Sequence, residues 1–319
     1  MRRTGWDTGA ARATSAATKD GRREPSRRPS ASKPEPTAAE HALAPGLYLV
    51  ATPIGNLGDV TLRALDVLRS VERIFCEDTR VTARLLARYG IATSLGIYHD
   101  HNAEEARPAI LAALRRGERV ALVSDAGTPL VSDPGYKLVR AAIAEGLSVT
   151  AAPGPSAALT ALILSGLPSD AFLFAGFLPP RQAARRSALE RWRTLEATTV
   201  FFEGAPRLAD SLADMADVLG DRSAAVAREM TKLHEEIRRG PLAELARDYR
   251  EAGPPRGEAV IVVGPPEAGV ADPADVDHRL RTALADLGVR DAAAKIAAET
   301  GLGRSELYRR ALAIRSEKE

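Results

Sequence analysis

Short apolar runs alternate with segments of helical periodicity between residues 46 and 154. The apolar runs that predict strands, each leading into a loop, lie at 46–55, 73–78, 119–125 and 148–154. Apolar residues recur at the spacing of a helix in 59–71, 79–90, 106–117 and 136–146. Strands that alternate with helices in this way predict an α/β fold with a mostly parallel sheet.

A second α/β segment follows, and after it the pattern becomes purely helical. Strands are predicted at 171–179, 198–204, 223–230 and 258–264, with helices between the first two pairs and at 241–253. The Pro- and Gly-rich stretch 264–273 predicts a linker, and the last two helical segments have helix-turn-helix proportions. The chain is therefore divided into a tail at 1–45, α/β lobes at 46–155 and 156–268, and a helical module at 269–319.

The composition of residues 1–45 predicts a disordered basic tail, because Arg, Ser, Pro and Ala dominate it. The tail holds nine basic and five acidic residues, and the rest of the chain has a net charge of −2. Nucleic-acid binding by the folded part would therefore need local basic patches. No signal peptide or membrane span is expected, since the longest apolar stretch is 157–167. The single cysteine, Cys76, excludes an intramolecular disulfide and fits a cytoplasmic protein.

Three loops of similar composition follow predicted strands and indicate a ligand site. They lie at 52–59, 124–135 and 153–157, and each combines Gly, Pro and small hydroxyl residues. Open α/β sheets bind ligands at the carboxyl ends of their strands, where glycine permits a close approach of the backbone. Each loop alone is also typical of an ordinary tight turn. None matches a dinucleotide or phosphate-loop pattern, so neither a dinucleotide nor a nucleoside triphosphate is expected.

Eight motifs in order carry a resemblance to a known family. They read ATPIGNLGDVTLRAL, EDTR, HDHN, VSDAGTPLVSDPGYKLV, PGPSA, LPSDAFLFAGFLP, FFEGAPRL and AREMTKLHEE. Together they resemble the ribosomal small-subunit cytidine 2′-O-methyltransferase branch of the tetrapyrrole methylase superfamily, from about Gly46 to about Arg315. The resemblance implies a two-lobed α/β fold of the class III S-adenosylmethionine (SAM) methyltransferases with a helical C-terminal module. It also implies a homodimer, and 16S ribosomal RNA of the small subunit as the substrate.

The same resemblance implies which residues bind SAM. Those that match the family's loops are Ile54, Asp125, Ala126, Gly127, Leu130, Ser156, Ala157 and Glu203. Asp125 to Leu130 would meet the methionine part, and Glu203 would lie near the adenosine end together with Lys232. The first loop, which holds Ile54, departs from the Gly-Pro-Gly-Asp sequence of other superfamily members.

Methyl transfer from a sulfonium is a single in-line displacement, so neither a metal nor a covalent nucleophile is expected. Positioning supplies most of the rate, and a base or cation near the ribose hydroxyl would help. Candidates are Asp78 at a strand end, His99 in the HDHN motif, and Lys232. Glu77 and His101 are neighbouring alternatives. The two histidines are equally compatible with a solvated loop pair or with imidazoles that bond the backbone.

A basic segment after residue 179 is the candidate RNA contact. Arg181, Arg185 and Arg186 would form a phosphate-binding patch, with Arg181 and Arg185 on one helix face. The alternative is a solvated basic helix. The Arg-rich C-terminal helices are a second candidate for RNA contact.

Two other classes of function stay open at this point. A tetrapyrrole methyltransferase would need a wide apolar trough and no basic helices. A non-catalytic nucleic-acid-binding protein would use the C-terminal helices but leave the three loops unexplained. Binding of SAM separates the second class from either enzyme, and methylation of 30S particles separates the enzymes.

Overall fold

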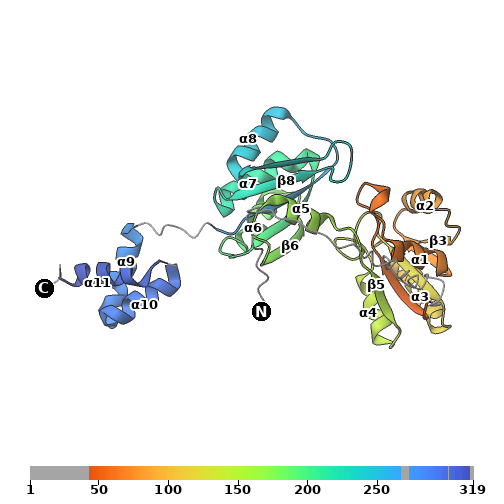
Figure 1. Ribbon diagram of the computed structural model, residues 1–319, viewed down its shortest axis with the longest axis horizontal. Helices are drawn as coiled ribbons and strands as arrows, with labels where there is room; N and C mark the ends of the chain where they lie inside the picture. The colour runs from red at the N-terminus through yellow and green to blue at the C-terminus, as the bar shows by residue number, and fades with distance from the viewer. Residues whose placement is uncertain (1–42, 267–272, 301, 317–319) are drawn as a thin grey trace, which may run out of the picture. The chain divides into compact units, whose positions relative to one another are not determined.

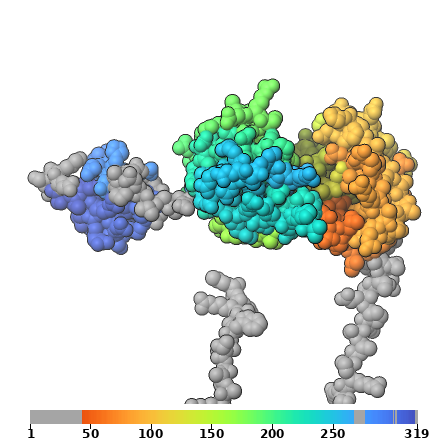
Figure 2. All heavy atoms as spheres, turned by 90° about the horizontal axis from the view of Figure 1, so that it is seen from above, coloured from red at the N-terminus to blue at the C-terminus, as the bar shows by residue number. Residues whose placement is uncertain are grey.

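The computed structural model describes residues 43–266, 273–300 and 302–316 (Figure 1). Two five-stranded sheets carry most of the described chain. A set of three C-terminal helices completes it. Each of these three bodies has a buried apolar cluster of its own, and Figure 2 shows their surfaces. Residues 1–42 of the predicted tail and 267–272 of the predicted linker lie outside the described residues.

The first sheet is entirely parallel, as the alternation of strands and helices predicts. Its order is β3-β2-β4-β1-β5. The strands are β1 (Gly46–Val50), β2 (Arg73–Cys76), β3 (Ser94–Ile97), β4 (Arg119–Val123) and β5 (Val149–Ala152). Because the strands are parallel, their carboxyl ends meet at one edge, and the loops at 52–59, 124–135 and 153–157 gather there.

Helices cover both faces of this sheet, since alternate residues of a strand point to opposite sides. Val50 and Ala121 pack against α1 (Leu62–Ser70) and α2 (Thr79–Arg88) on one face. Leu47 and Leu122 pack against α3 (Ala103–Arg115) and α4 (Tyr136–Ala144) on the other. The first lobe is therefore a doubly wound α/β unit.

The second sheet is mixed, in order β6-β7-β10-β8-β9. Its strands are β6 (Phe172–Phe177), β7 (Thr198–Gly204), β8 (Ser223–Arg228), β9 (Glu236–Pro241) and β10 (Glu258–Val263). Strands β6 and β7 are parallel, and the other pairs are antiparallel. The mostly parallel sheet predicted from residues 46–154 is therefore confirmed in the first lobe, and the second lobe has a mixed sheet.

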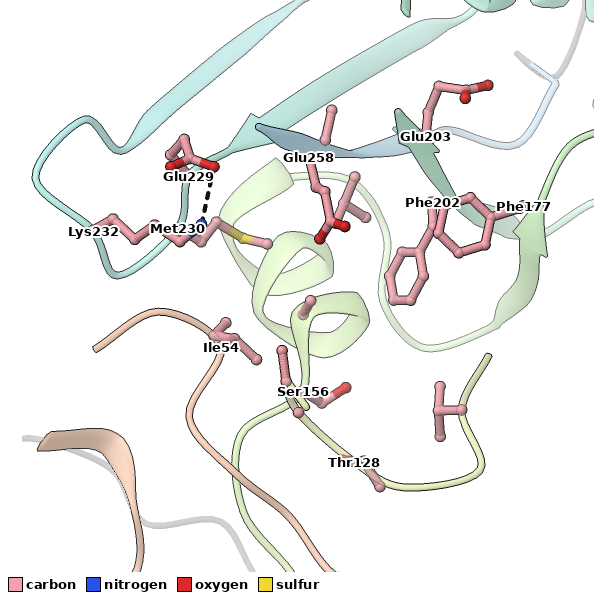
Figure 3. Close-up of a pocket in the computed structure, with 16 residues that line it drawn as sticks. Ile54, Thr128, Ser156, Phe177, Phe202, Glu203, Glu229, Met230, Lys232 and Glu258 are labelled. Carbon is pink, nitrogen blue, oxygen red and sulfur yellow. Dashed lines mark hydrogen bonds and ion pairs between the residues drawn. The ribbon is translucent and has the colours of Figure 1, made fainter. Parts of the chain in front are cut away.

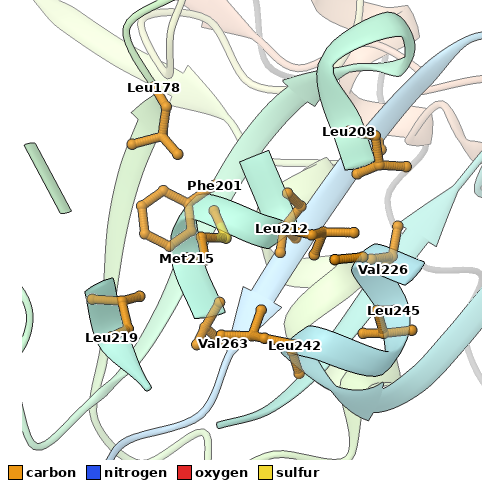
Figure 4. Packing of buried hydrophobic residues seen from close by; sticks show 14 of the residues in the cluster. Leu178, Phe201, Leu208, Leu212, Met215, Leu219, Val226, Leu242, Leu245 and Val263 are labelled. Carbon is orange, nitrogen blue, oxygen red and sulfur yellow. The ribbon is translucent and has the colours of Figure 1, made fainter. Parts of the chain in front are cut away.

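One face of the second sheet carries the largest apolar cluster. It packs against α6 (Gln182–Glu190), α7 (Leu208–Leu219) and α8 (Leu242–Ala252), as Figure 4 shows around Phe201, Leu212 and Met215. The opposite face packs against α5 (Ala157–Ser165). Both lobes thus have a sheet covered by helices on both sides, although their strand directions differ.

The C-terminal helices form a separate core. They are α9 (Pro273–Asp286), α10 (Val289–Thr300) and α11 (Arg304–Ser316), and they bury Leu280, Ile296 and Leu307 among themselves. The purely helical prediction is confirmed, while the exact boundary residues assigned to the lobes and the module stay predictions. Within the described ranges, no helix is both long and apolar enough to cross a membrane.

Candidate functional site

A hollow of about 110 Å³ lies where the loops of the first lobe face strands of the second (Figure 3). We call it the first hollow. Its lining from the first lobe and the start of α5 comprises Ile54, Ala126, Gly127, Thr128, Val131, Ser156 and Ala157. Its lining from the second lobe comprises Phe177, Phe202, Glu203, Glu229, Met230, Lys232, Glu258, Ala259 and Val260. Apolar walls with a few polar groups are typical of small-molecule sites.

Backbone and hydroxyl hydrogen bonds hold the three predicted loops together. The amide of Thr52 donates to the carbonyl of Gly127 at 2.9 Å, and the amide of Gly127 donates back at 3.0 Å. The Thr128 hydroxyl donates to the carbonyl of Pro155 at 3.1 Å. The Ser124 hydroxyl donates to the Asp133 carboxylate, and this hydrogen bond connects the two turns of the loop 124–135, which we call the central loop. The edge of the first sheet is therefore a preformed surface.

Gly127 combines a left-handed backbone with little room for a side chain. Its φ is +87°, and an added Cβ would lie 3.3 Å from Cγ2 of Ile54 and 3.7 Å from the carbonyl oxygen of Pro155. Only glycine adopts this backbone conformation without strain while leaving the hollow open.

Four non-glycine residues near the hollow have left-handed backbone. They are Leu130 and Ser132 in the central loop, and Glu229 and Thr231 in the turn after β8, with φ between +48° and +70°. Such residues cost about 1–3 kcal/mol each and cluster at functional sites. Their position on both sides of the first hollow supports a functional role for it.

A second hollow, of about 470 Å³, adjoins the first. The two share Ile54, Ala126 and Lys232 in their walls. The rest of the second lining comprises Thr52, Pro53, Gly55, Leu57, Val81, Thr82, Arg84, Leu85, Ser124 and Asp125. A molecule in one hollow would therefore lie next to a molecule in the other.

Most of the predicted SAM-binding residues gather at the first hollow. Ile54, Ala126, Gly127, Ser156, Ala157 and Glu203 line it. Asp125 instead lines the second hollow. Leu130 lines neither, and packs against the first-lobe core around Leu138. The structure thus brings six of the eight predicted residues to the first hollow and places Asp125 and Leu130 outside its wall, and SAM binding by these residues stays a prediction.

The Glu203 carboxylate does not face the first hollow (Figure 3). It accepts a hydrogen bond from the Ser211 hydroxyl at 2.5 Å and forms an ion pair with Arg207. The side chain is almost fully buried. Glu203 therefore contributes its backbone to the wall, and its carboxylate holds the start of α7.

The catalytic candidate Asp78 is the N-cap of α2. Its carboxylate accepts from the amide of Arg80 at 2.8 Å and forms an ion pair with the Arg80 guanidinium. These hydrogen bonds lower the pKa of Asp78 to about 2. A carboxylate so strongly stabilised in its charged form is a weak base, and Asp78 lines neither hollow.

His99 forms reciprocal hydrogen bonds with Asn102. The amide of His99 donates to Oδ1 of Asn102 at 2.8 Å, and the amide of Asn102 donates to Nδ1 of His99 at 3.2 Å. An acceptor at Nδ1 places the proton of the neutral imidazole on Nε2. His99 thus accepts from a backbone amide through Nδ1, as one of the two alternatives describes, and its catalytic role stays a prediction.

Lys232 is the candidate that reaches the walls of both hollows. Its Nζ lies 3.0 Å from Oε1 of Glu229, the ion pair drawn in Figure 3. The preceding residue, Thr231, accepts a hydrogen bond from the amide of Asn56 at 3.1 Å. A Cβ on Gly55 would lie 2.6 Å from Cγ of Lys232, so this turn packs closely on the first loop.

The predicted phosphate-binding patch requires a correction at Arg185. This side chain is 5% exposed and forms an ion pair with the buried carboxylate of Asp214. It therefore has no free surface to offer a phosphate. Arg186 is partly exposed and pairs with Asp214 and Asp217, while Arg181 is exposed at the N-cap of α6.

Sequence reasoning missed most of the second-lobe wall. Phe177 and Phe202 face the first hollow beside Glu258, whose carboxylate extends into it (Figure 3). Glu258 begins β10 and lies opposite Gly204 of β7 in the antiparallel register. That register depends on which strands are neighbours, and local sequence pattern does not reveal this. The only sequence signal for these residues is their place at the ends of apolar strands.

Comparison with known proteins gives consistent matches over the described bodies. The family model Tetrapyrrole (Corrin/Porphyrin) Methylases matches residues 46–246, and the model RsmI C-terminal HTH domain matches residues 270–315. The ribosomal RNA small subunit methyltransferase I of Mesorhizobium japonicum is 53% identical over 274 residues, which cover 86% of this chain and 93% of that protein. The protein of the same name from Erythrobacter litoralis is 53% identical over 274 residues, 86% of this chain and 97% of that protein. The crystal structure of uroporphyrin-III-C-methyltransferase from Thermus thermophilus superposes with a TM-score of 0.51 at 22% identity, covering 68% and 93% of the two chains. That likeness shows the fold of the two lobes.

Proposed function

This chain belongs to the tetrapyrrole (corrin/porphyrin) methylase family, and from that membership we propose that it methylates the ribose 2′-hydroxyl of a cytidine in 16S ribosomal RNA, with SAM as methyl donor. The observation that carries the proposal is the match at 53% identity to proteins named ribosomal RNA small subunit methyltransferase I, over 93% of the length of one of them. The two family models match residues 46–246 and 270–315, so the C-terminal helices are matched as well as the two lobes. The decoding region is the proposed location of the cytidine.

The residues of the first hollow fit SAM. Phe177, Phe202 and Met230 supply apolar and aromatic surface for an adenine ring. The Glu258 carboxylate, which extends into the hollow, supplies negative charge for the cationic groups of the donor. When bound, SAM supplies a methyl group activated by its positively charged sulfur.

The first-lobe loops would hold the other side of the donor. Gly127 leaves the surface open, and Ile54, Ser156 and Ala157 form the adjacent wall. The hydrogen bonds between Thr52 and Gly127 fix this wall before binding, so little conformational entropy is lost when a ligand arrives. The chain's own contribution to rate is therefore positioning and exclusion of water.

Contact with RNA is proposed for two surfaces. Arg181 and Arg186 are the cations of the segment before and within α6 that retain exposure. In the helical module, Arg304, Arg309 and Arg315 are exposed on α11. Both surfaces would contact phosphates and so position the protein on the particle without reading sequence.

A homodimer is also part of the proposal. Helix α5 is apolar on nearly all sides, and Leu159 and Ile163, one turn apart, are 50% and 75% exposed. A helix that is apolar all round is normally buried, so a second copy would cover this face. Light scattering at micromolar concentration tests the assembly.

Because the proposed substrate is ribosomal, we propose a cytoplasmic location for the enzyme.

The deciding experiment is methylation of 30S particles from cells that lack this activity. Purified protein and radiolabelled SAM should label 16S RNA, and mapping by nuclease digestion and mass spectrometry should locate a single 2′-O-methylcytidine. Labelling of a tetrapyrrole precursor instead, with unlabelled RNA, would contradict the proposal. Calorimetric titration with SAM separates failure of donor binding from failure of substrate recognition.

A further inference from the structure

The second hollow has features of a nucleotide site that the donor does not account for. We propose that it receives the acceptor nucleotide, and that Asp125 takes the proton of the ribose 2′-hydroxyl. This inference rests on the proposed function, because it identifies where the acceptor lies in the same site. The shared wall of Ile54, Ala126 and Lys232 would bring the two reactants side by side.

The Asp125 carboxylate is oriented with one oxygen held and the other available. Its Oδ1 accepts a hydrogen bond from the backbone amide of Asp78 at 3.0 Å. Its Oδ2 makes no hydrogen bond with any residue that the structure describes, and the residue lines the second hollow. A general base needs a free lone pair directed at the proton that it removes, and this geometry provides one.

The surroundings of Asp125 also raise its basicity. Burial raises the pKa of Asp125, the hydrogen bond from the Asp78 amide partly opposes this, and the Asp78 charge adds to the rise. The adjacent Asp78 has its pKa lowered to about 2 by Arg80. The pKa values of these two neighbouring carboxyl groups are thus shifted in opposite directions. In enzymes, this pattern distinguishes the carboxylate that accepts a proton from the one that stays charged.

An unpartnered buried hydroxyl supports a polar ligand in the second hollow. Thr82 is 3% exposed, and its hydroxyl makes no hydrogen bond with the described residues. The Cys76 thiol lies beside it, but a thiol is only a weak hydrogen-bonding group. A buried hydroxyl without a partner is unfavourable, and a polar group of a bound nucleotide would supply that partner.

The remaining lining matches the other parts of a nucleotide. Leu57, Val81 and Leu85 give an apolar wall for the base. Arg84 is exposed at the wall and forms no ion pair with any described residue, so it is available to a phosphate. A base against apolar side chains with a cation at the rim is how single-stranded nucleotides are commonly held.

The proposed step conserves atoms and charge. The 2′-oxygen forms a bond to the methyl carbon, and the carbon–sulfur bond breaks with its electron pair remaining on sulfur. The 2′-proton moves to Oδ2 of Asp125 as the oxygen attacks. Asp125 then releases the proton to solvent before the next turnover.

Asp125→Asn is the central test, because it keeps the shape and removes the basic oxygen. Single-turnover methylation of 30S particles should slow by about 100-fold or more. In the wild type the rate should fall as pH drops below the raised pKa of Asp125, since the base is then protonated. Above that pKa the wild-type rate should reach a plateau. The variant should show no plateau, and its rate should rise in proportion to the hydroxide concentration. Asp66→Asn on α1, an exposed carboxylate outside both hollows, serves as the control and should keep the wild-type profile.

Two binding measurements complete the test. Cytidine 5′-monophosphate, added to protein saturated with S-adenosylhomocysteine, should shift the amide NMR signals of Thr82 and Asp125, and Thr82→Val should weaken that binding. The SAM affinity of Asp125→Asn should equal that of the wild type. Weakened SAM binding with an unchanged pH profile would assign the second hollow to the donor and overturn the proposal. A full rate in Asp125→Asn would overturn it as well. A wild type that binds SAM but leaves 30S particles unlabelled would contradict the proposed function itself.

Discussion

Arg185 and Asp214 form an ion pair inside the second lobe, with 2.6 Å between Nη2 and Oδ2 and side-chain exposures of 5% and 2%. Gln182 donates a further hydrogen bond to the same carboxylate at 3.0 Å. The pair connects α6 to α7. Arg185 belongs to a basic cluster in the sequence, but in the structure it stabilises the fold.

Removal of one partner of this pair should destabilise the protein strongly. Asp214→Ala leaves the Arg185 charge buried without a counter-ion, so the free energy of unfolding should fall by about 3–5 kcal/mol. Asp217→Ala is the matched control. Its carboxylate is 57% exposed and contacts Arg186, so the loss should be about 1 kcal/mol or less. Urea denaturation followed by circular dichroism measures both. Equal losses of unfolding free energy in the two variants would mean that burial does not increase the contribution of the ion pair to stability.

Gly127→Val should abolish SAM binding while the protein still folds. The new side chain would meet Ile54 and occupy the first hollow. Gly146→Val is the control, because Gly146 also has a positive φ, of +69°, but has open space where its Cβ would be. Both variants should lose some stability through backbone strain. Calorimetric titration should show loss of SAM binding in Gly127→Val and not in Gly146→Val. Wild-type SAM affinity in Gly127→Val would mean that the donor does not bind in the first hollow.

The salt dependence of RNA binding should distinguish the exposed arginines from the buried one. If Arg181 and Arg186 hold phosphates, replacing both by Ala should flatten the slope of log affinity against log salt by about 1.4, at about 0.7 per contact on single strands. Arg185→Ala should reduce stability and leave the slope unchanged, since its guanidinium is bound to Asp214. Filter binding to 30S particles over a salt series measures the slopes. An unchanged slope in the double variant would restore the solvated-helix interpretation.

Deletion of residues 270–319 should weaken methylation of the particle and spare SAM binding. The helical module has its own apolar core, and the cores of both lobes contain no residue from it, so the lobes should still fold. The loss should appear as a raised KM for 30S particles with an unchanged calorimetric affinity for SAM. Full activity at limiting particle concentration would assign the module another role.

Local pattern predicted the first lobe well because a parallel sheet has a local signature. Buried strands followed by helices recur there, and the loops with Gly, Pro and hydroxyl residues must then meet at one edge. Strand β3 was missed because it is short, lies at the sheet edge and is only partly buried. The meeting of these three loops at one sheet edge was therefore predictable from residue types alone.

The second lobe was less predictable, because its pairings depend on contacts between distant residues. Strand β9 has the sequence EIRRGP, which has no apolar run, and it forms by pairing with β8. The burial of Arg185 likewise depends on Asp214, 29 positions away. No periodicity within α6 reveals such a partner, and that is why a structural arginine was assigned to RNA.

The left-handed backbone at Leu130, Ser132, Glu229 and Thr231 has a consequence for adaptation to temperature. Glycine at any of these positions would relieve strain, yet it would also let the loops beside the first hollow sample other shapes. Heat tolerance and turnover therefore oppose each other there. Lineages that move to warmer habitats would have to gain their stabilising substitutions in other parts of the chain.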